Sequence, residues 1–586
     1  MDSVKSIKGY GKVDEAQDLE LKRKTRRRLI LISVSAVVLV AVIIAGVIAG
    51  VVHSRRNNSP ESALTPPPTL TPAASLRTVC SVTRYPASCI SSISKLPSSN
   101  TTDPEVLFRL SLTVVVNELA SLSDLPERLA GETGDDRIKS AIRVCGDLIE
   151  EAIDRLNDSV SAMDVGDGQQ ILNSSKIEDL KTWLSAAVTD YDTCFDALDE
   201  LAFNKTEYAN STIVNSLKSA MKNSTEFTSN SLAIVSKILK ALGDLGIPIH
   251  GRRLLAGDGF PAWVGQAERR LLQAVDVRPD VTVAADGSGD VKTVNEAVAK
   301  VPKKSKTRFV IYVKGGTYVE NVVMDKSIWN VMIYGDGKTK TIISGSKNFI
   351  DGTPTYETAT FAIQGKGFIM KDIGIINTAG AAKHQAVAFR SGSDLSVYYR
   401  CSFDAFQDTL YPHSNRQFYR DCDVTGTIDF IFGNAAVVFQ NCNIHPRQPL
   451  SNQFNTITAQ GKKDPNQNSG ISIQRCTISA NGNVTAPTYL GRPWKEFSTT
   501  VIMQTEIAGF IKPAGWMSWV SGVDPPASIL YGEYKNSGPG SSVAQRVKWA
   551  GYKPVMSDVE AGKFTVASFL QGGEWLPGTG VAYQLS

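Results

Sequence analysis

The sequence predicts a multidomain protein with an N-terminal transmembrane signal-anchor helix, an all-α four-helix bundle and an all-β, right-handed parallel β-helix. Three observations predict this fold. Residues 29–52 form an uncharged, mostly apolar stretch, residues 76–242 carry apolar side chains at helical spacing, and short strand-like runs recur from residue 281 onward. A chain of 586 residues also exceeds the size that one hydrophobic core usually serves.

The N-terminal region is organised around Leu29–Val52, which is long enough to cross a bilayer as one helix. Residues 1–28 end in a strongly basic run, and only Arg55 and Arg56 follow the apolar stretch. The positive-inside rule therefore places residues 1–28 in the cytosol and anchors the unprocessed precursor in the membrane. A cleaved signal peptide is the alternative, because Ala45–Gly50 offers small residues where a signal peptidase could cut.

Residues 53–75 are rich in Pro, Ser and Thr, which predicts an extended linker. Apolar residues at steps of three and four then predict a helical bundle over residues 76–242, with helices near 104–120, 138–156, 177–198 and 214–242. Cys145 and Cys194 lie on core-facing stripes and could pair, and Cys80 could pair with Cys89 across a short hairpin. Buried free cysteines are the simpler alternative.

Glycosylation sequons crowd into the same region, which indicates a secretory route. The sequons lie at Asn100, Asn157, Asn173, Asn204, Asn210, Asn223 and Asn483.

Charge is distributed unevenly along the chain. Residues 57–272 contain 20 Lys+Arg against 28 Asp+Glu, whereas residues 273–586 contain 31 against 25. The acidic and basic parts can therefore attract each other, and the basic part can meet a polyanion. No basic stripe interleaved with aromatic residues is present, so we expect no nucleic-acid partner.

The two parts are separated by residues 243–272, which lose helical periodicity and are rich in Gly and Pro. Such a stretch is expected to be exposed to proteases. An Arg-Arg-Leu-Leu sequence occurs there twice, as Arg252, Arg253, Leu254, Leu255 and as Arg269, Arg270, Leu271, Leu272. A single dibasic pair is usually only a solvated surface feature, but the repetition at a domain junction predicts cleavage by a protease of the secretory pathway.

The region after residue 273 is organised by a repeat in which Cys401, Cys422 and Cys442 follow similar strand-like runs at steps of 21 and 20 residues. This spacing fits the coils of a parallel β-helix. Asp408 and Asp429 each lie seven residues after a cysteine, so they should occupy the same phase of adjacent coils at about 5 Å.

Two carboxylates this close resist joint ionisation, which favours one as a general acid. The other must stay charged to act as a nucleophile and needs a cation, for which Arg492 is the candidate. The simpler interpretation is that both aspartates only cap turns.

Several ordered motifs resemble those of plant pectin methylesterases. They are Gly316–Glu320, Gln385–Arg390, Gln407–Tyr411, Gly426–Gly433 and Leu490–Trp494. The segment before Cys89 and the segments Trp183–Ala187 and Thr193–Cys194 resemble the plant invertase and pectin methylesterase inhibitor family. The whole chain is therefore similar to the long form of the esterase family, which is made as a pro-protein with an inhibitor-like pro-region at residues 76–242 and a catalytic domain at 273–586.

The resemblance implies hydrolysis of the C6 methyl esters of homogalacturonan to pectate and methanol. It assigns Asp429 as the nucleophile that forms an acyl-enzyme and Asp408 as the proton donor and later base. It assigns Gln407 and Gln385 to the oxyanion, as amide donors suited to a tetrahedral intermediate.

The same resemblance assigns supporting roles. Arg492 would keep Asp429 ionised, and Trp494 and Thr355 would contact the sugar. It also pairs Cys422 with Cys442 and leaves Cys401 and Cys476 reduced. The partners it implies are methyl-esterified pectin, a processing protease and inhibitor-family proteins, and the destination is the extracellular cell wall.

Other functional classes remain open at this point. A glycosidase or a calcium-dependent lyase would also use acidic clusters on a β-helix, and a non-catalytic inhibitor or pectin-binding protein is a third class. His413 and His445 lack a Gly-x-Ser-x-Gly elbow and a metal-ligand set, so we expect them to be structural and expect no metal or cofactor. Trp516 and Trp519 either line a groove or pack in the core.

Overall fold

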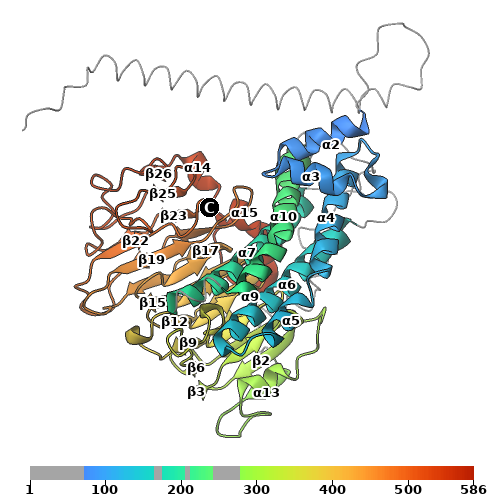
Figure 1. Ribbon diagram of the computed structural model, residues 1–586. Coiled ribbons are helices and arrows are strands. Elements are labelled where there is room, and N and C mark those ends of the chain that lie inside the picture. Colours follow the sequence, from blue (N-terminus) through green and yellow to red (C-terminus); the bar gives the residue numbers. More distant parts are fainter. Residues whose placement is uncertain (1–70, 164–173, 205–210, 242–277) are drawn as a thin grey trace, which may run out of the picture.

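The computed structural model describes residues 71–163, 174–204, 211–241 and 278–586. The predicted cytosolic tail, the membrane helix, nearly all of the 53–75 linker and both Arg-Arg-Leu-Leu copies lie outside these residues. The first helix of the described residues, α2, begins at Pro72, inside the predicted linker, because Thr71 caps it and proline suits the first helical turn. Figure 1 shows the helical bundle running along one side of the β-helix.

The helical part is the predicted four-helix bundle, built from the long helices α4, α6, α7 and α10 with shorter helices around them. Its elements are α2 (Pro72–Ser81), α3 (Pro86–Ile93), η1 (Pro97–Ser99), α4 (Pro104–Ala120), α5 (Leu125–Gly131), α6 (Asp136–Met163), α7 (Ser174–Asn204), α9 (Thr212–Ala220), α10 (Lys222–Ile234) and the π-helical turn η2 (Val235–Leu239).

The bundle core follows the predicted helical stripes. On α6 the residues at steps of three and four, from Ile138 to Leu156, are buried. The last predicted helix is divided, because α9 ends and α10 begins at Met221. Among the described residues one stretch, Pro104–Gly131, is apolar and long enough to span a membrane. It contains α4, whose Leu107, Phe108 and Leu112 are buried in the bundle core.

Two of the three predicted disulfides are present. Cys80 is bonded to Cys89, and Cys145 on α6 is bonded to Cys194 on α7, with Cα atoms 4.6 Å apart in the second pair. The second bond fixes the longest helix pair of the bundle.

The remaining described residues form three parallel sheets of a β-helix, as predicted. The 11-stranded sheet contains β1 (Val281–Val283), β2 (Phe309–Val313), β5 (Val331–Gly335), β8 (Ile369–Lys371), β11 (Ser396–Tyr399), β14 (Arg416–Arg420), β17 (Ala436–Gln440), β20 (Gly470–Gln474), β23 (Thr499–Met503), β25 (Leu530–Tyr534) and β26 (Tyr552–Lys553).

The 8-stranded sheet contains β3 (Gly316–Val319), β6 (Thr341–Gly345), β9 (Gly374–Asn377), β12 (Ser402–Asp404), β15 (Asp423–Gly426), β18 (Asn443–Pro446), β21 (Thr477–Ile478) and β24 (Glu506–Ile507). The 7-stranded sheet contains β4 (Val322–Met324), β7 (Phe361–Ile363), β10 (Phe389–Ser391), β13 (Leu410–Pro412), β16 (Ile431–Gly433), β19 (Asn455–Gln460) and β22 (Thr488–Gly491).

Short helices and turns complete this part: α13 (Val294–Val298), η3 (Thr355–Glu357), η4 (Ala381–Lys383), α14 (Asp558–Gly562), α15 (Val566–Leu570), α16 (Gly572–Trp575) and η5 (Leu576–Thr579). Val294 and Ala297 of α13 belong to the β-helix core, so this helix covers the first coil.

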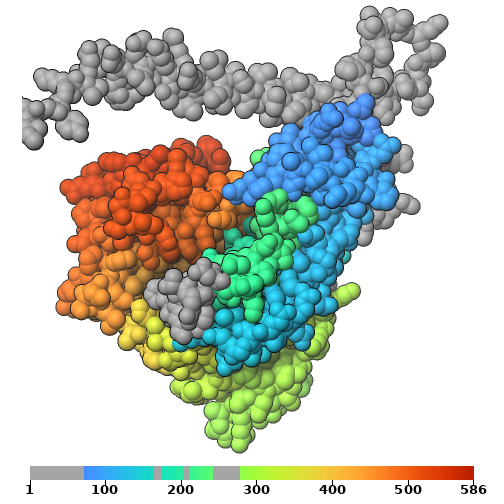
Figure 2. Space-filling view, viewed as in Figure 1, coloured from blue at the N-terminus to red at the C-terminus, as the bar shows by residue number. Residues whose placement is uncertain are grey.

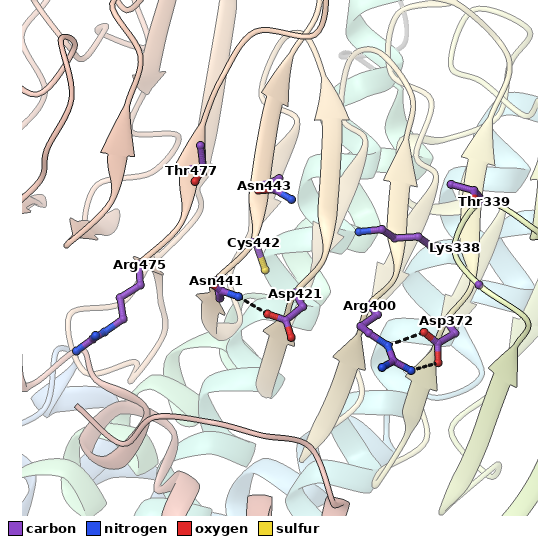
Figure 3. Close-up of a pocket in the computed structure, with 11 residues that line it drawn as sticks. Lys338, Thr339, Asp372, Arg400, Asp421, Asn441, Cys442, Asn443, Arg475 and Thr477 are labelled. Atoms are coloured by element: carbon purple, nitrogen blue, oxygen red, sulfur yellow. Dashed lines mark hydrogen bonds and ion pairs between the residues drawn. The ribbon is translucent and has the colours of Figure 1, made fainter. Parts of the chain in front are cut away.

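The cysteine repeat marks one corner of the coils, between the 11-stranded and 8-stranded sheets. The residue before each repeat cysteine is left-handed, with φ of 53° at Arg400 and 55° at Asp421. Such residues turn the chain and direct the cysteine into the core. Figure 3 shows this corner, which forms a shallow pocket where Arg400 is ion-paired with Asp372.

The predicted bond between Cys422 and Cys442 is wrong for this structure, in which both are buried thiols like Cys401 and Cys476. Each thiol is satisfied where it lies, since Cys422 donates to the carbonyl of Tyr398 and Cys442 to that of Tyr419. The prediction took the Cys422–Cys442 disulfide from the family resemblance. In this structure the two residues belong to a column of four buried thiols in successive coils.

The bundle packs on the outer face of the 7-stranded sheet. One hydrophobic cluster contains the bundle core together with Tyr411, Phe432 and Ala459 of that face. The space-filling view shows the helices lying against the coils (Figure 2). The face on which the predicted catalytic residues lie is therefore the face that the bundle covers.

Candidate active site

Asp408 and Asp429 lie at the start of neighbouring strands of the 7-stranded sheet. Leu410 on β13 pairs with Ile431 on β16, and each aspartate lies two residues before its paired residue. The two carboxyls therefore occupy the same position in adjacent coils, as the cysteine spacing predicts. Both residues are left-handed, with φ of 64° and 52°, a conformation that often accompanies functional positions.

Asp429 is held as one half of a bidentate ion pair. Arg492 donates from Nε to Oδ1 at 2.9 Å and from Nη2 to Oδ2 at 2.6 Å. Thr456 donates its hydroxyl to Oδ1 at 2.6 Å and accepts the backbone N–H of Asp429 at 2.9 Å. These contacts orient the carboxylate and compensate its charge although only 5% of the residue is exposed.

Asp408 has the opposite environment. Burial, reinforced by the charge of Asp429 and then of Glu200, raises the pKa of Asp408 well above its usual value, and Arg492 only partly opposes this. Burial therefore favours the protonated form of this carboxyl. One charged and one protonated carboxyl side by side can supply a nucleophile and a general acid.

Amide donors lie beside this pair. Gln385 and Gln407 face each other in adjacent coils through a parallel bridge, and Gln407 immediately precedes Asp408. The family resemblance assigns both glutamines to the oxyanion, and the structure places them next to each other in neighbouring coils.

Aromatic rings continue the site along the sheet. Tyr411 stacks on Phe432 with ring centroids 4.1 Å apart, and Trp494 stacks on Trp519 at 6.3 Å. Trp519 is 39% exposed and lies 4.2 Å from the Arg492 guanidinium carbon, so it borders the site. Trp516 is buried in the β-helix core, so of these two tryptophans only Trp519 borders the site.

The bundle reaches into the site through the last turns of α7. The backbone N–H of Thr355 donates to Glu200 Oε2 at 3.1 Å, and Lys495 is ion-paired with Asp196. Burial raises the pKa of Glu200 to about 7. Sequence reasoning missed both α7 residues, because a helical stripe shows which side chains are buried but not which surface covers them.

The two histidines that the sequence predicts to be structural form hydrogen bonds with residues other than Asp408 and Asp429. His413 is buried and shares a 2.8 Å hydrogen bond with Thr193 of α7, and burial lowers its pKa well below the usual value. His445 contacts Ser479. Among the described residues no group of three His, Cys, Asp or Glu side chains is arranged to hold a metal ion.

An ion-paired aspartate beside one whose pKa is raised by burial is the arrangement expected of a hydrolytic enzyme that works with two carboxyls. The family model described as Pectinesterase matches residues 280–573, and that described as Plant invertase/pectin methylesterase inhibitor matches residues 74–234. The chain belongs to the pectinesterase family, whose members are carboxylic ester hydrolases, and carries an inhibitor-family domain ahead of the catalytic one.

Individual relatives agree with this assignment. The chain is 77% identical to "Pectinesterase 1" of Arabidopsis thaliana over 100% of both chains, and 62% identical to "Pectinesterase 3" of Phaseolus vulgaris over 100% of this chain and 99% of that one. Among solved structures, "Pectin methylesterase from Carrot" is 54% identical with a TM-score of 0.52, and the match covers 53% of this chain and 99% of the carrot chain.

Proposed function

We propose that this chain is a pro-enzyme that hydrolyses the C6 methyl esters of cell-wall homogalacturonan, giving pectate and methanol. The observation that carries the proposal is the contrast between Asp429, which is ion-paired with Arg492, and Asp408, whose pKa is raised by burial. Family membership supplies the substrate class.

In the first half-reaction a carboxylate oxygen of Asp429 attacks the C6 ester carbon. The negative charge that develops on the carbonyl oxygen is stabilised by the amides of Gln385 and Gln407. The tetrahedral intermediate collapses by breaking the bond to the methoxy oxygen, which takes the proton of Asp408 and leaves as methanol. An acyl-enzyme on Asp429 remains.

In the second half-reaction the ionised Asp408 takes a proton from water, and the resulting hydroxide attacks the same carbon. The bond to Asp429 breaks, releasing a galacturonate carboxyl and restoring the starting protonation states. In this proposal Arg492 keeps Asp429 ordered, and Trp494 and Thr355 contact the sugar.

The bundle restrains this activity until it is removed. Glu200 lies at Thr355, Asp196 is paired with Lys495, and Tyr411 and Phe432 share the hydrophobic cluster of the bundle. A polysaccharide cannot occupy the same face at the same time. Cleavage at either Arg-Arg-Leu-Leu copy by a secretory-pathway protease would separate the domains, and separate inhibitor-family proteins could later bind the same face.

The proposed route leads from a membrane-anchored precursor through the secretory pathway to the cell wall. The described sequons, Asn100, Asn157, Asn223 and Asn483, are exposed, and the bundle carries two disulfides. Both features suit an oxidising, glycosylating compartment.

The test uses residues 273–586, which have their own hydrophobic core and correspond to the whole carrot protein, so they are expected to fold alone. We expect methanol release from highly esterified pectin without chain shortening, and loss of at least about a thousandfold in kcat for Asp429→Ala. Asp421→Ala is the matched control, because Asp421 is also left-handed but lies at another corner of its coil, between the 11-stranded and 8-stranded sheets.

Three other results would contradict the proposal. Shortened chains without methanol would indicate a glycosidase or lyase. A folded fragment without activity would indicate a binding protein, and equal activity of cut and uncut full-length chains would remove the restraining role of the bundle.

A further inference from the structure

Thr456 of β19 contacts Asp429 from the neighbouring coil, and neither half-reaction assigns it a role. Its hydroxyl accepts the backbone N–H of Asp429 at 2.9 Å and donates to Oδ1 of the same residue at 2.6 Å. One hydroxyl therefore holds both the main chain and the carboxylate of Asp429. Thr456 is fully buried, so it acts on the aspartate and not on the polysaccharide.

The main chain fixes Thr456 against the segment that carries Asp429. The backbone N–H of Thr456 donates to the carbonyl of Thr427 at 3.2 Å, and its carbonyl accepts the N–H of Phe430 at 3.3 Å. A β-branched side chain has few χ1 rotamers, so the hydroxyl is held as firmly as the strand. Asp429 is left-handed, with φ of 52°, and these bonds stabilise a conformation that is costly for a residue with a side chain.

The two carboxylate oxygens of Asp429 are hydrogen-bonded differently. A carboxylate oxygen has two lone pairs that can accept. Oδ1 accepts from two separate donors, the hydroxyl of Thr456 at 2.6 Å and Nε of Arg492 at 2.9 Å. Oδ2 accepts Nη2 of Arg492 at 2.6 Å and only the longer arm of the shared Nε donor, at 3.2 Å. Oδ2 therefore keeps the more available lone pair.

Thr341 of β6 shows the same main-chain contact without a bond to a carboxylate. Its hydroxyl accepts the backbone N–H of Asp336 at 2.9 Å but donates to the carbonyl of Val313 at 3.2 Å. Thr341 is also fully buried, and it lies on the 8-stranded sheet, whereas the carboxyl pair lies at the 7-stranded sheet. A threonine can thus support the main chain without touching a carboxylate, so the bond from Thr456 to Oδ1 calls for a further reason.

We propose that Thr456 is a positioning residue of the esterase reaction: its hydroxyl holds Oδ1 of Asp429 and leaves Oδ2 as the oxygen that attacks the ester. Oδ2 forms the bond to C6, methanol leaves with the proton of Asp408, and Oδ1 becomes a carbonyl oxygen that still accepts from Thr456. When water attacks C6, the bond to Oδ2 breaks, and the charge returns to a carboxylate whose Oδ1 already faces its two donors. The inference rests on the proposed function and names the atom that reacts.

The test compares residues 273–586 as wild type, Thr456→Val and Thr456→Ser, with methanol release measured across a range of pH. Valine has the shape of threonine without the hydroxyl, and serine keeps the hydroxyl. Thr341→Val is the matched control, because it removes the equivalent acceptor of an aspartate N–H at a distant coil. Urea unfolding of each variant shows whether a lower rate reflects less folded protein.

We expect Thr456→Val to lower kcat about ten- to a hundredfold, because a hydrogen bond to a charged group is lost, and to change KM little. The acidic limb of its pH profile should move to higher pH, since the hydroxyl favours the ionised carboxylate. The titratable groups around Asp429 are Asp408, Arg492 and Tyr531, and the variant leaves all three in place. Thr456→Ser should recover most of the lost rate and the position of the limb, and the control should match the wild type.

Four results would overturn the inference. They are a Thr456→Val enzyme with wild-type kcat, a slower one whose acidic limb does not move, a Thr456→Ser enzyme as slow as Thr456→Val, and an equal loss in Thr341→Val. Each leaves the esterase proposal standing, whereas a wild type that releases no methanol contradicts the proposed function itself. If Thr456→Val does not fold, Thr456→Ala removes the same hydroxyl and is compared with Thr456→Ser.

Discussion

Apart from Asp408, three buried carboxyls of the β-helix and two carboxyls of the bundle lie in opposite environments. The β-helix pairs Asp394, Asp429 and Glu533 with arginines of the same domain. Although burial opposes it, Arg416 lowers the pKa of Asp394 to about 2. On the bundle, burial raises the pKa values of Asp192 and Glu200 to about 7.

The difference shows which domain neutralises its buried carboxylates with cations of its own. A carboxylate with its own arginine stays charged whether or not another domain is present. The bundle carboxyls are buried by docking, so they lose water and gain only partial compensation. The β-helix is therefore expected to be self-sufficient, and the contact between the domains is expected to depend on conditions.

The largest expected effect is a loss of stability on removing one partner of a buried ion pair inside the β-helix. Glu533 and Arg546 are each 2% exposed at the side chain, and Glu533 also accepts hydrogen bonds from Trp516 and Tyr552. Glu533→Gln leaves the guanidinium charge buried without its partner, so we expect the free energy of unfolding of residues 273–586 to fall by about 3–5 kcal/mol. Urea unfolding measures it.

The matched control for this variant is Glu560→Gln, which removes the surface pair with Lys553. Solvent screens a surface pair of this kind, so we expect a far smaller loss of stability than for Glu533→Gln. Equal effects of the two variants would contradict the view that the β-helix depends on its internal ion pairs.

The internal organisation of each domain could be predicted because it repeats. Cys401 and Cys422, 21 residues apart, fix the coil length, and this spacing alone places Asp408 beside Asp429. The stripe from Ile138 to Leu156 likewise indicates one buried helix face. Periodic patterns of this kind report burial within a domain.

The contact between the domains could not be predicted in this way. Asp196 is paired with Lys495 at a separation of 299 residues and Glu200 accepts from Thr355 at a separation of 155, with no repeat that relates the partners. The opposite net charges of the two parts of the chain predict that the parts attract each other, but they do not identify which residues form ion pairs. The sequence pattern also could not predict that Cys422 is a free thiol, because the spacing aligns four cysteines and does not show whether any two of them are bonded.

The next largest effect is a pH dependence of docking. The pKa values of Asp192 and Glu200 are raised in the docked state, so docking takes up protons. The contact should be strongest below the ordinary carboxyl range, near pH 4, and should weaken as pH rises to about 7. The charged groups around Asp192 are Lys495, Asp196, Lys463 and Asp464.

This can be measured on full-length chain cut at an introduced protease site between the domains. We expect the dissociation constant of the two parts to rise by roughly tenfold or more from pH 5 to pH 8. The double variant Asp192→Asn, Glu200→Gln cannot ionise at these positions and should flatten the profile. An unchanged slope in that variant would assign the pH dependence to other groups.

The smallest expected effect lies at the rim of the same contact. Lys326 pairs with Glu150 at 3.0 Å and with Asp154 at 3.4 Å on α6, and its side chain is 30% exposed. Solvent screens such pairs, so Lys326→Ala should weaken docking by at most about 1 kcal/mol, and the difference from wild type should vanish in high salt. The same cut chain gives the measurement at low and high ionic strength. A loss beyond about tenfold that persists in high salt would mean that rim charges, rather than the buried surface over the active site, hold the two domains together.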